Sequence, residues 1–214
     1  MSGDKNSEYL ESYLQDSERV ARSLREQIDA QSKIVDRIFE AWESGNTVFL
    51  IGNGGSAGTA THFAADLVKT TIDRPTQRGV KAMALVDNIP LVSAATNDWG
   101  WGEVYQGQLR TFWREGDVVI GFSVHGGSGS DKAGAWSQNL LKALQFAKDN
   151  GGTAIGFSGF DGGAMKDLCD VSVVVPAEST PLVEAFHVVL FHGITFRLKE
   201  RLTNLYKITY EDIR

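Results

Sequence analysis

Apolar residues recur every three or four positions through the first part of the chain. They are Leu10, Leu14, Val20, Leu24, Ile28, Ile34, Ile38 and Trp42. This period is typical of amphipathic helices, and no proline or glycine interrupts it before Gly45. The stretch is long for one helix of a globular protein, so the pattern predicts two helices within residues 7–44, with a break between Ala30 and Lys33. The first helix either lies across a neighbouring subunit or caps its own domain.

The pattern changes at Thr47, where short continuous apolar runs begin to alternate with helical stretches. The predicted strands are Thr47–Ile51, Val80–Val86, Val118–Phe122, Thr153–Phe157 and Val171–Pro176. The predicted helices are Ser56–Thr70, Ile89–Thr96, Glu103–Trp113, Lys132–Asp149, Ala164–Leu168 and 181–202. Continuous apolar runs are typical of parallel strands buried on both faces. Their alternation with helices predicts an α/β fold with an open, doubly wound, five-stranded parallel sheet.

We expect one domain over residues 1–214, because this length suits a single core and no low-complexity linker divides the chain. It would comprise N-terminal helices over about 7–44 and an α/β core over about 47–202. The last helix has a predicted N-cap at Ser179 or Thr180, with Pro181 at its first position.

The charge balance argues against a general nucleic-acid binder, because the formal net charge is -6 and the pI is about 5.2. The only cysteine, Cys169, allows no internal disulfide, and its apolar neighbours predict a buried small side chain. No run of 18 apolar residues is present, and Met1–Lys5 lacks the apolar core of a secretory signal. We therefore expect a cytoplasmic protein without a membrane segment.

Two loops rich in glycine and serine each follow a predicted strand and open a predicted helix. They span residues 52–59 and 123–131. Glycine allows close approach of the backbone, and free N–H groups at a helix N-terminus bind anions. In the first loop Asn53 and Ser56 add donors that suit sugar hydroxyls, and in the second the serines Ser123, Ser128 and Ser130 suit phosphate oxygens. Both loops lie at the carboxyl edge of a parallel sheet, which predicts one site for a small phosphorylated ligand.

Other phosphate ligands fit this pattern less well. The sequence Gly52-x-Gly54-x-x-Ala57 matches the loose dinucleotide fingerprint, but the acid that ends the next strand, Asp87, lies about thirty residues on instead of twenty. The Gly-x4-Gly-Lys-Ser/Thr motif of nucleoside triphosphate sites is absent.

Two helices carry candidate proton-transfer or metal-binding groups. His62 and Asp66 are four residues apart and share a helical face, as two metal ligands, a ligand and a base, or a plain surface pair. The last helix carries Glu184, His187 and His192 in an otherwise apolar stretch, where a polar side chain needs a partner. Glu184 and His192 would meet at one ion only if their side chains lean toward each other.

A series of motifs follows in chain order, and its members are Gly52-Asn53-Gly54-Gly55-Ser56-Ala57, His62-Phe63-Ala64-Ala65-Asp66-Leu67, Asn97-Asp98, Arg114-Glu115-Gly116-Asp117-Val118, Gly159-Phe160-Asp161-Gly162-Gly163 and Glu184-Ala185-Phe186-His187 with His192. Together they closely resemble the phosphoheptose isomerases, which are sugar-isomerase (SIS) domain proteins. The match runs from about residue 8 to 202. The resemblance implies the SIS fold and interconversion of sedoheptulose 7-phosphate and D-glycero-D-manno-heptose 7-phosphate. It also implies a homotetramer with active sites at subunit interfaces, assembled partly by the N-terminal helices.

The resemblance also implies roles for individual residues. The catalytic acid falls on Asp66 and the catalytic histidine on His192. Zinc ligands, where the family has them, fall on His62, Asp66, Glu184 and His192. Contacts to the phosphorylated sugar fall on Asn53, Gly54, Ser56, Asn97, Asp98, Ser123 and Ser128. The sugar C1–C2 unit would sit between Asp66 and His192, one of which removes the proton beside the carbonyl while the other moves a proton between the oxygens.

The chain departs from the usual family pattern near this site. Asp66 stands where glutamate is usual, and Glu184 where glutamine is usual. Residues 123–128 read Ser-Val-His-Gly-Gly-Ser instead of Ser-Thr-Ser-Gly-Asn-Ser, and Pro181 replaces a frequent aspartate. Beside the heptose phosphate isomerase we therefore keep two hypotheses: a non-catalytic SIS-domain tetramer that binds a replication-initiator protein, and an isomerase or binder of another sugar phosphate.

Overall fold

The computed structural model describes residues 4–127 and 137–211, and its centre is a five-stranded parallel sheet in the order β2-β1-β3-β4-β5. The strands are β1 (Val48–Gly52), β2 (Ala82–Ala84), β3 (Val118–Phe122), β4 (Thr153–Gly159) and β5 (Val171–Val175). The first strand, β1, lies next to the edge; β2 adds on its outer side, and β3, β4 and β5 then follow in order toward the other edge. The predicted doubly wound α/β sheet is therefore confirmed.

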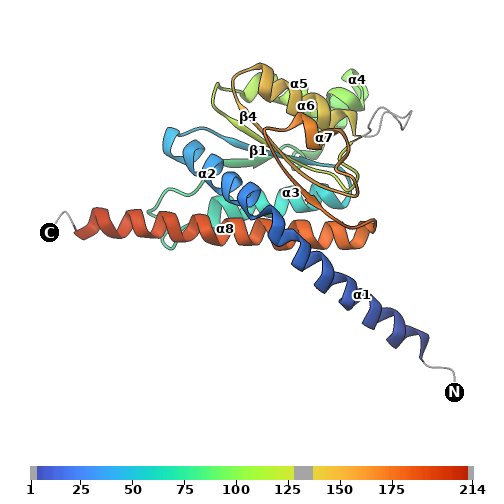
Figure 1. The fold of residues 1–214 in the computed structure, drawn as a ribbon. Coiled ribbons are helices and arrows are strands. Elements are labelled where there is room, and N and C mark those ends of the chain that lie inside the picture. Colours follow the sequence, from blue (N-terminus) through green and yellow to red (C-terminus); the bar gives the residue numbers. More distant parts are fainter. Residues whose placement is uncertain (1–3, 128–136, 212–214) are drawn as a thin grey trace.

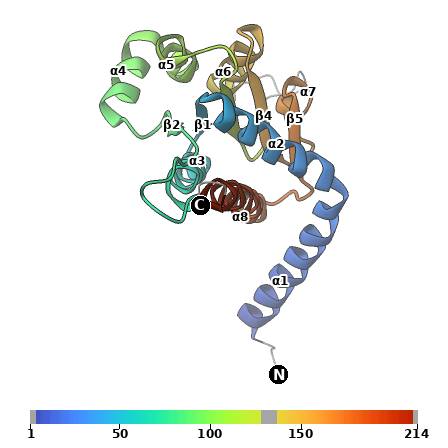
Figure 2. The ribbon, with the colours of Figure 1, turned by 90° about the vertical axis from the view of Figure 1, so that its left-hand side faces the viewer.

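Helices cover both faces of this sheet (Figures 1 and 2). One layer holds α2 (Ile28–Ser44), α3 (Gly55–Ala65) and α8 (Thr180–Glu211), and the other holds α4 (Ile89–Trp99), α5 (Val104–Phe112), α6 (Gln138–Asp149) and α7 (Gly163–Leu168). The buried apolar residues form two clusters, one on each face of the sheet. Buried strands explain the continuous apolar runs in the sequence, since both faces of each central strand meet a helix layer.

The sheet register aligns the ends of the three central strands. Gly52 of β1 pairs with Phe122 of β3, and Phe122 pairs with Phe157 of β4. The loops that begin at Asn53 and Ser123 therefore leave neighbouring strands at the same level. The first of the two glycine- and serine-rich loops and the start of the second, residues 123–127, therefore lie at one edge of the sheet, as the sequence pattern predicted.

The N-terminal helices break earlier in the chain than predicted. Helix α1 (Lys5–Ser23) ends at a 3-10 turn, Leu24–Gln27, where we expected a break within 30–33. The side chain of Gln27 donates to the Val174 carbonyl at 2.7 Å and accepts from the Val174 N–H at 2.9 Å. Gln27 thus completes the hydrogen bonds of the edge strand β5, a long-range contact with no local sequence signal. Helix α1, which precedes this turn, projects away from the body of the molecule (Figure 1).

Several element lengths also differ from the sequence pattern. Strand β2 keeps three residues of the predicted Val80–Val86, because the Val80 N–H bonds to the Leu67 carbonyl after α3. Helix α8 continues beyond residue 202 to Glu211. The predicted helix 132–149 is described from Gln138, and its residues 132–136 lie outside the described ranges. Cys169 is half-buried, and burial raises its pKa to about 12.

Within helix α8, the segment Thr180–Lys207 is long and apolar enough to cross a membrane, with a mean hydropathy of 1.2. Half of that window is buried inside the protein. Its apolar side contributes Val183, Phe191 and Leu198 to the core between α8 and the sheet. A core helix of a soluble protein meets the same length and hydropathy test, so this single helix is weak support for a membrane span.

Candidate active site

Two histidines and one carboxylate meet where α3 lies against α8. The Nε2 atom of His192 lies 3.5 Å from Asp66 Oδ2, and Nε2 of His62 lies 3.9 Å from the same oxygen. One ligand atom from each residue lies within 4.8 Å of the others. The Asp66 side chain is 16% exposed, whereas those of His62 and His192 are 51% and 40% exposed. The group is therefore open to a ligand on its histidine side.

Aromatic packing between the two helices brings the histidines together. Phe63 of α3 stacks on Phe191 of α8, with ring centroids 5.0 Å apart. Both rings are fully buried, so this contact fixes how the helices lie against each other. The residues next to them, His62 and His192, then meet at the surface with ring centroids 5.0 Å apart. The stacking of Phe63 on Phe191 thus determines that His62 and His192 lie side by side.

A change of helix type occurs at the carboxylate. Asp66 is the first residue of a π-helical turn, Asp66–Thr70, that continues α3. Within this turn the Thr70 hydroxyl donates to Asp66 Oδ1 at 2.9 Å. That bond leaves Oδ2 directed toward the two histidines. Single π turns inside helices are frequent at functional sites, and this one orients the carboxylate.

Glu184 is not a member of this three-residue group. Its carboxylate lies at the start of α3, where a Cβ on Gly55 would collide with Glu184 Oε1. A larger residue at position 55 would therefore require the flexible Glu184 side chain to move. The N-terminus of a helix stabilises a negative charge, which accounts for this placement. Of the predicted metal ligands, the structure brings together His62, Asp66 and His192.

The first glycine-rich loop is shaped by its glycines. Gly54 has φ 57° and ψ -125°, a conformation that favours glycine. A Cβ on Gly52 would collide with the Ser56 carbonyl, so the backbone turns back on itself directly after β1. Ser56 is buried in the first turn of α3. Asn53 exchanges two hydrogen bonds with Asn139 of α6, at 3.0 and 2.8 Å.

The chain resembles known proteins along most of its length. A family model described as SIS domain matches residues 8–159. A phosphoheptose isomerase of Aliarcobacter butzleri is 36% identical over 176 residues, which cover 82% of this chain and 86% of that protein. The chain belongs to the phosphoheptose isomerase family. The structure of a phosphoheptose isomerase from Neisseria gonorrhoeae superposes with a TM-score of 0.79 at 25% identity, over 92% of this chain and all of that one.

A second relative has a different name and a greater length. The lincomycin biosynthesis protein LmbN of Streptomyces lincolnensis is 40% identical over 185 residues. The matched segment covers 85% of this chain but 65% of LmbN, so the chain spans about two thirds of that longer protein.

The remaining residues expected to contact the sugar phosphate in this family are more scattered. Asn97 and Asp98 are exposed near the end of α4, where the Asn97 amide donates to the Asp98 carboxylate at 2.7 Å. Ser123 is buried directly after β3, and its N–H bonds to the Phe157 carbonyl at 3.0 Å. Ser128 lies outside the described residues. Sequence reasoning missed Thr70, whose spacing of four from Asp66 is the signal that points to it.

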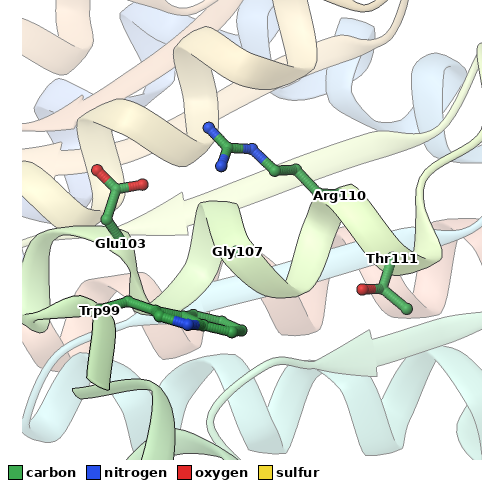
Figure 3. A pocket seen from close by; sticks show the side chains of 5 residues that line it. All are labelled: Trp99, Glu103, Gly107, Arg110 and Thr111. Carbon is green, nitrogen blue, oxygen red and sulfur yellow. The ribbon is translucent and has the colours of Figure 1, made fainter. Parts of the chain in front are cut away.

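A separate pocket of about 610 Å³ lies on the outer side of α5 (Figure 3). Its lining residues are Trp99, Glu103, Gly107, Arg110 and Thr111. Gly107 makes room for the indole of Trp99, because a Cβ there would collide with the ring. The pocket belongs to the helix layer opposite α3 and α8 (Figure 2) and contains none of the predicted site residues.

Proposed function

We propose that this chain is an aldose–ketose isomerase that interconverts sedoheptulose 7-phosphate and D-glycero-D-manno-heptose 7-phosphate. One observation carries the proposal: Asp66 Oδ2 and His192 Nε2 lie 3.5 Å apart, where the end of α3, the helix that follows the Gly52–Gly55 loop, meets α8. A carboxylate and an imidazole at this separation can serve two neighbouring carbons and their oxygens. Family membership supports the same reaction class.

Asp66 and His192 would divide the proton transfers between them. One group removes the proton beside the carbonyl and returns it at the adjacent carbon. The other moves a proton between the two oxygens, so that a cis-enediol lies between the two sugars. The Thr70 hydroxyl holds Asp66 for this role. The loop residues Asn53, Gly54 and Ser56 and the residues Asn97, Asp98, Ser123 and Ser128 would hold the substrate.

The His62, Asp66 and His192 group also fits a zinc ion. Ligand atoms about 2.1 Å from a tetrahedral ion lie about 3.4 Å apart. The two pairs that include Asp66 lie 3.5 and 3.9 Å apart, and all three ligand atoms lie within 4.8 Å of one another. Two imidazoles and a carboxylate are a donor set that zinc takes in catalytic sites. Bound zinc would polarise the sugar carbonyl. Glu184 would be a fourth ligand only after its carboxylate leaves Gly55.

We also propose that the chain forms a single domain, assembles as a homotetramer and is located in the cytoplasm. Tyr9, Leu10 and Leu14 are exposed on α1, the helix that extends away from the body. A neighbouring subunit would cover these apolar side chains. Light scattering after size-exclusion chromatography tests the assembly, with a monomer mass as the contrary result.

Another sugar phosphate is the second candidate substrate. The similarity to LmbN favours it, because the name of that protein assigns it to lincomycin biosynthesis. The non-catalytic alternative, a tetramer that binds a replication initiator, is not favoured by the relatives named above.

The test combines an assay with a metal measurement on the same preparation. Isomerisation of sedoheptulose 7-phosphate is followed with and without chelator, beside a panel of ketose and aldose phosphates. We expect turnover of the heptose phosphate and about one zinc per subunit, with turnover lost on chelation. Preference for another member of the panel would support the second candidate. No turnover of any sugar phosphate would overturn both.

A further inference from the structure

The side chain of Asn53 is largely occupied by contacts within the protein. Its Oδ1 accepts from Asn139 Nδ2 at 2.8 Å, and its Nδ2 donates to Asn139 Oδ1 at 3.0 Å. The Tyr105 hydroxyl lies 3.3 Å from the same Oδ1. One N–H of the amide is therefore left for a ligand. Such a residue is better suited to shape its loop than to supply several contacts to a sugar.

Tyr105 holds the backbone where strand β1 passes into this loop. Its hydroxyl donates to the Gly52 carbonyl at 2.5 Å. The residue is almost fully buried on α5, and burial raises the pKa of its hydroxyl above the usual range, so the group stays protonated as a donor. The last carbonyl of β1 thus keeps a partner where the backbone departs from the strand ladder.

Asn139 fastens the loop from a second helix. It is fully buried on α6, and its Oδ1 also accepts from the Leu140 N–H at 3.0 Å. Its rotamer is therefore fixed by its own helix as well as by Asn53. Tyr105 and Asn139 come from α5 and α6, which pack in the layer opposite α3 and α8 (Figure 2). The loop is held from the side of the sheet that the acid–base pair does not touch.

We propose that Tyr105 and Asn139 are positioning residues for the isomerase, which hold Asn53 and the Gly52–Gly55 turn in the form that presents backbone N–H groups to the sugar. This inference rests on the proposed function. A loop misplaced by about 1 Å can lower a rate about 100-fold. Both residues touch only Gly52, Asn53 and their own helices in the polar contacts that the structure describes.

The principal variant is Tyr105→Phe, which removes one hydroxyl without changing the ring. Asn139→Leu is the second, because leucine has a similar volume and no hydrogen bonds. We expect kcat to fall roughly 10- to 100-fold in each, with a smaller change in KM for Tyr105→Phe. Hydrogen exchange followed by mass spectrometry should show faster exchange in peptides that contain residues 52–56, a readout that needs no activity.

Gln108→Met is the matched control. Gln108 is also buried on α5, but it donates to the Leu85 and Val104 carbonyls at 3.0 and 2.9 Å and does not contact the loop. We expect a comparable loss of thermal stability, kcat within about twofold of the parent, and unchanged exchange in residues 52–56.

The outcomes separate the two proposals. If the parent turns over no sugar phosphate but loop exchange is still faster in the two variants, the proposed function is overturned and the holding role stays intact. Unchanged loop exchange in Tyr105→Phe and Asn139→Leu would overturn the holding role. Faster exchange with unchanged kcat, or an equal loss of kcat in Gln108→Met, would overturn the positioning role.

Discussion

His192 Nε2 lies 3.5 Å from Asp66 Oδ2, although the two residues belong to the first and the last helical segments of the α/β core in the sequence. Phe63 and Phe191, their near neighbours in the chain, stack beneath them. The acid–base pair therefore depends on an apolar contact that contains no functional group. Activity and stability can be separated experimentally because different side chains carry them.

Asp66→Asn and His192→Gln each remove one member of this pair while keeping its size. We expect kcat to fall by at least about 100-fold in both, which is the usual contribution of a general acid or base. The melting temperature should change little, because both side chains lie at the surface end of the helix contact. Steady-state kinetics and thermal unfolding check this, and near-parent turnover in either variant would contradict the assigned roles.

Thr70→Val tests the π turn that orients the carboxylate. Valine keeps the branched shape but loses the hydroxyl that donates to Asp66 Oδ1 at 2.9 Å. We expect kcat to fall roughly tenfold, because Asp66 is still present but its carboxylate is no longer held in one rotamer. Thr71→Val is the matched control, since its hydroxyl bonds to the Leu67 carbonyl instead. An equal fall in kcat for both variants would mean that the turn matters only for folding.

His62→Gln tests the metal group without changing the acid–base pair. We expect the zinc content, measured by mass spectrometry of the purified protein, to fall below about one tenth of the parent value, because two ligands bind much more weakly than three. Glu184→Gln is the comparison, and we expect it to retain zinc, because the Glu184 carboxylate lies at Gly55 and outside the group. Loss of zinc in Glu184→Gln would instead make Glu184 a ligand.

The buried His187 should make the protein less stable as the pH falls below about 6.5. Burial lowers its pKa to about 4, and its Nε2 lies 3.2 Å from the Ser158 carbonyl. The unfolded chain takes up this proton near pH 6.5, whereas the folded chain does so near pH 4, so stability falls as the pH drops through that window. Well above pH 6.5 the residue is neutral in both states and contributes no slope.

The variant His187→Leu removes this contribution. Between pH 6.5 and 5 its free energy of unfolding should fall about 1 to 2 kcal/mol less than that of the parent. Urea unfolding at the two pH values and one protein concentration measures the difference. Parallel pH dependence in parent and variant would show that His187 titrates normally in the folded protein.

The sequence predicted the fold class well because strand burial has a local signature. The predicted strands Val118–Phe122 and Val171–Pro176 are mostly apolar, and the structure has strands over Val118–Phe122 and Val171–Val175. The break between α1 and α2 was placed wrongly, because it depends on Gln27 meeting Val174 of β5. No residue near the break carries a signal of that contact.

The sequence by itself determined the layered α/β fold, the two glycine-rich loops and the pairing of His62 with Asp66, because period and spacing are properties of neighbouring residues. Only the tertiary structure decided that His192 joins this pair while Glu184 lies at Gly55. It also decided that Tyr105 and Asn139 hold the first loop. These contacts join segments far apart in the chain, and they follow from how the buried faces of the helices pack on the sheet.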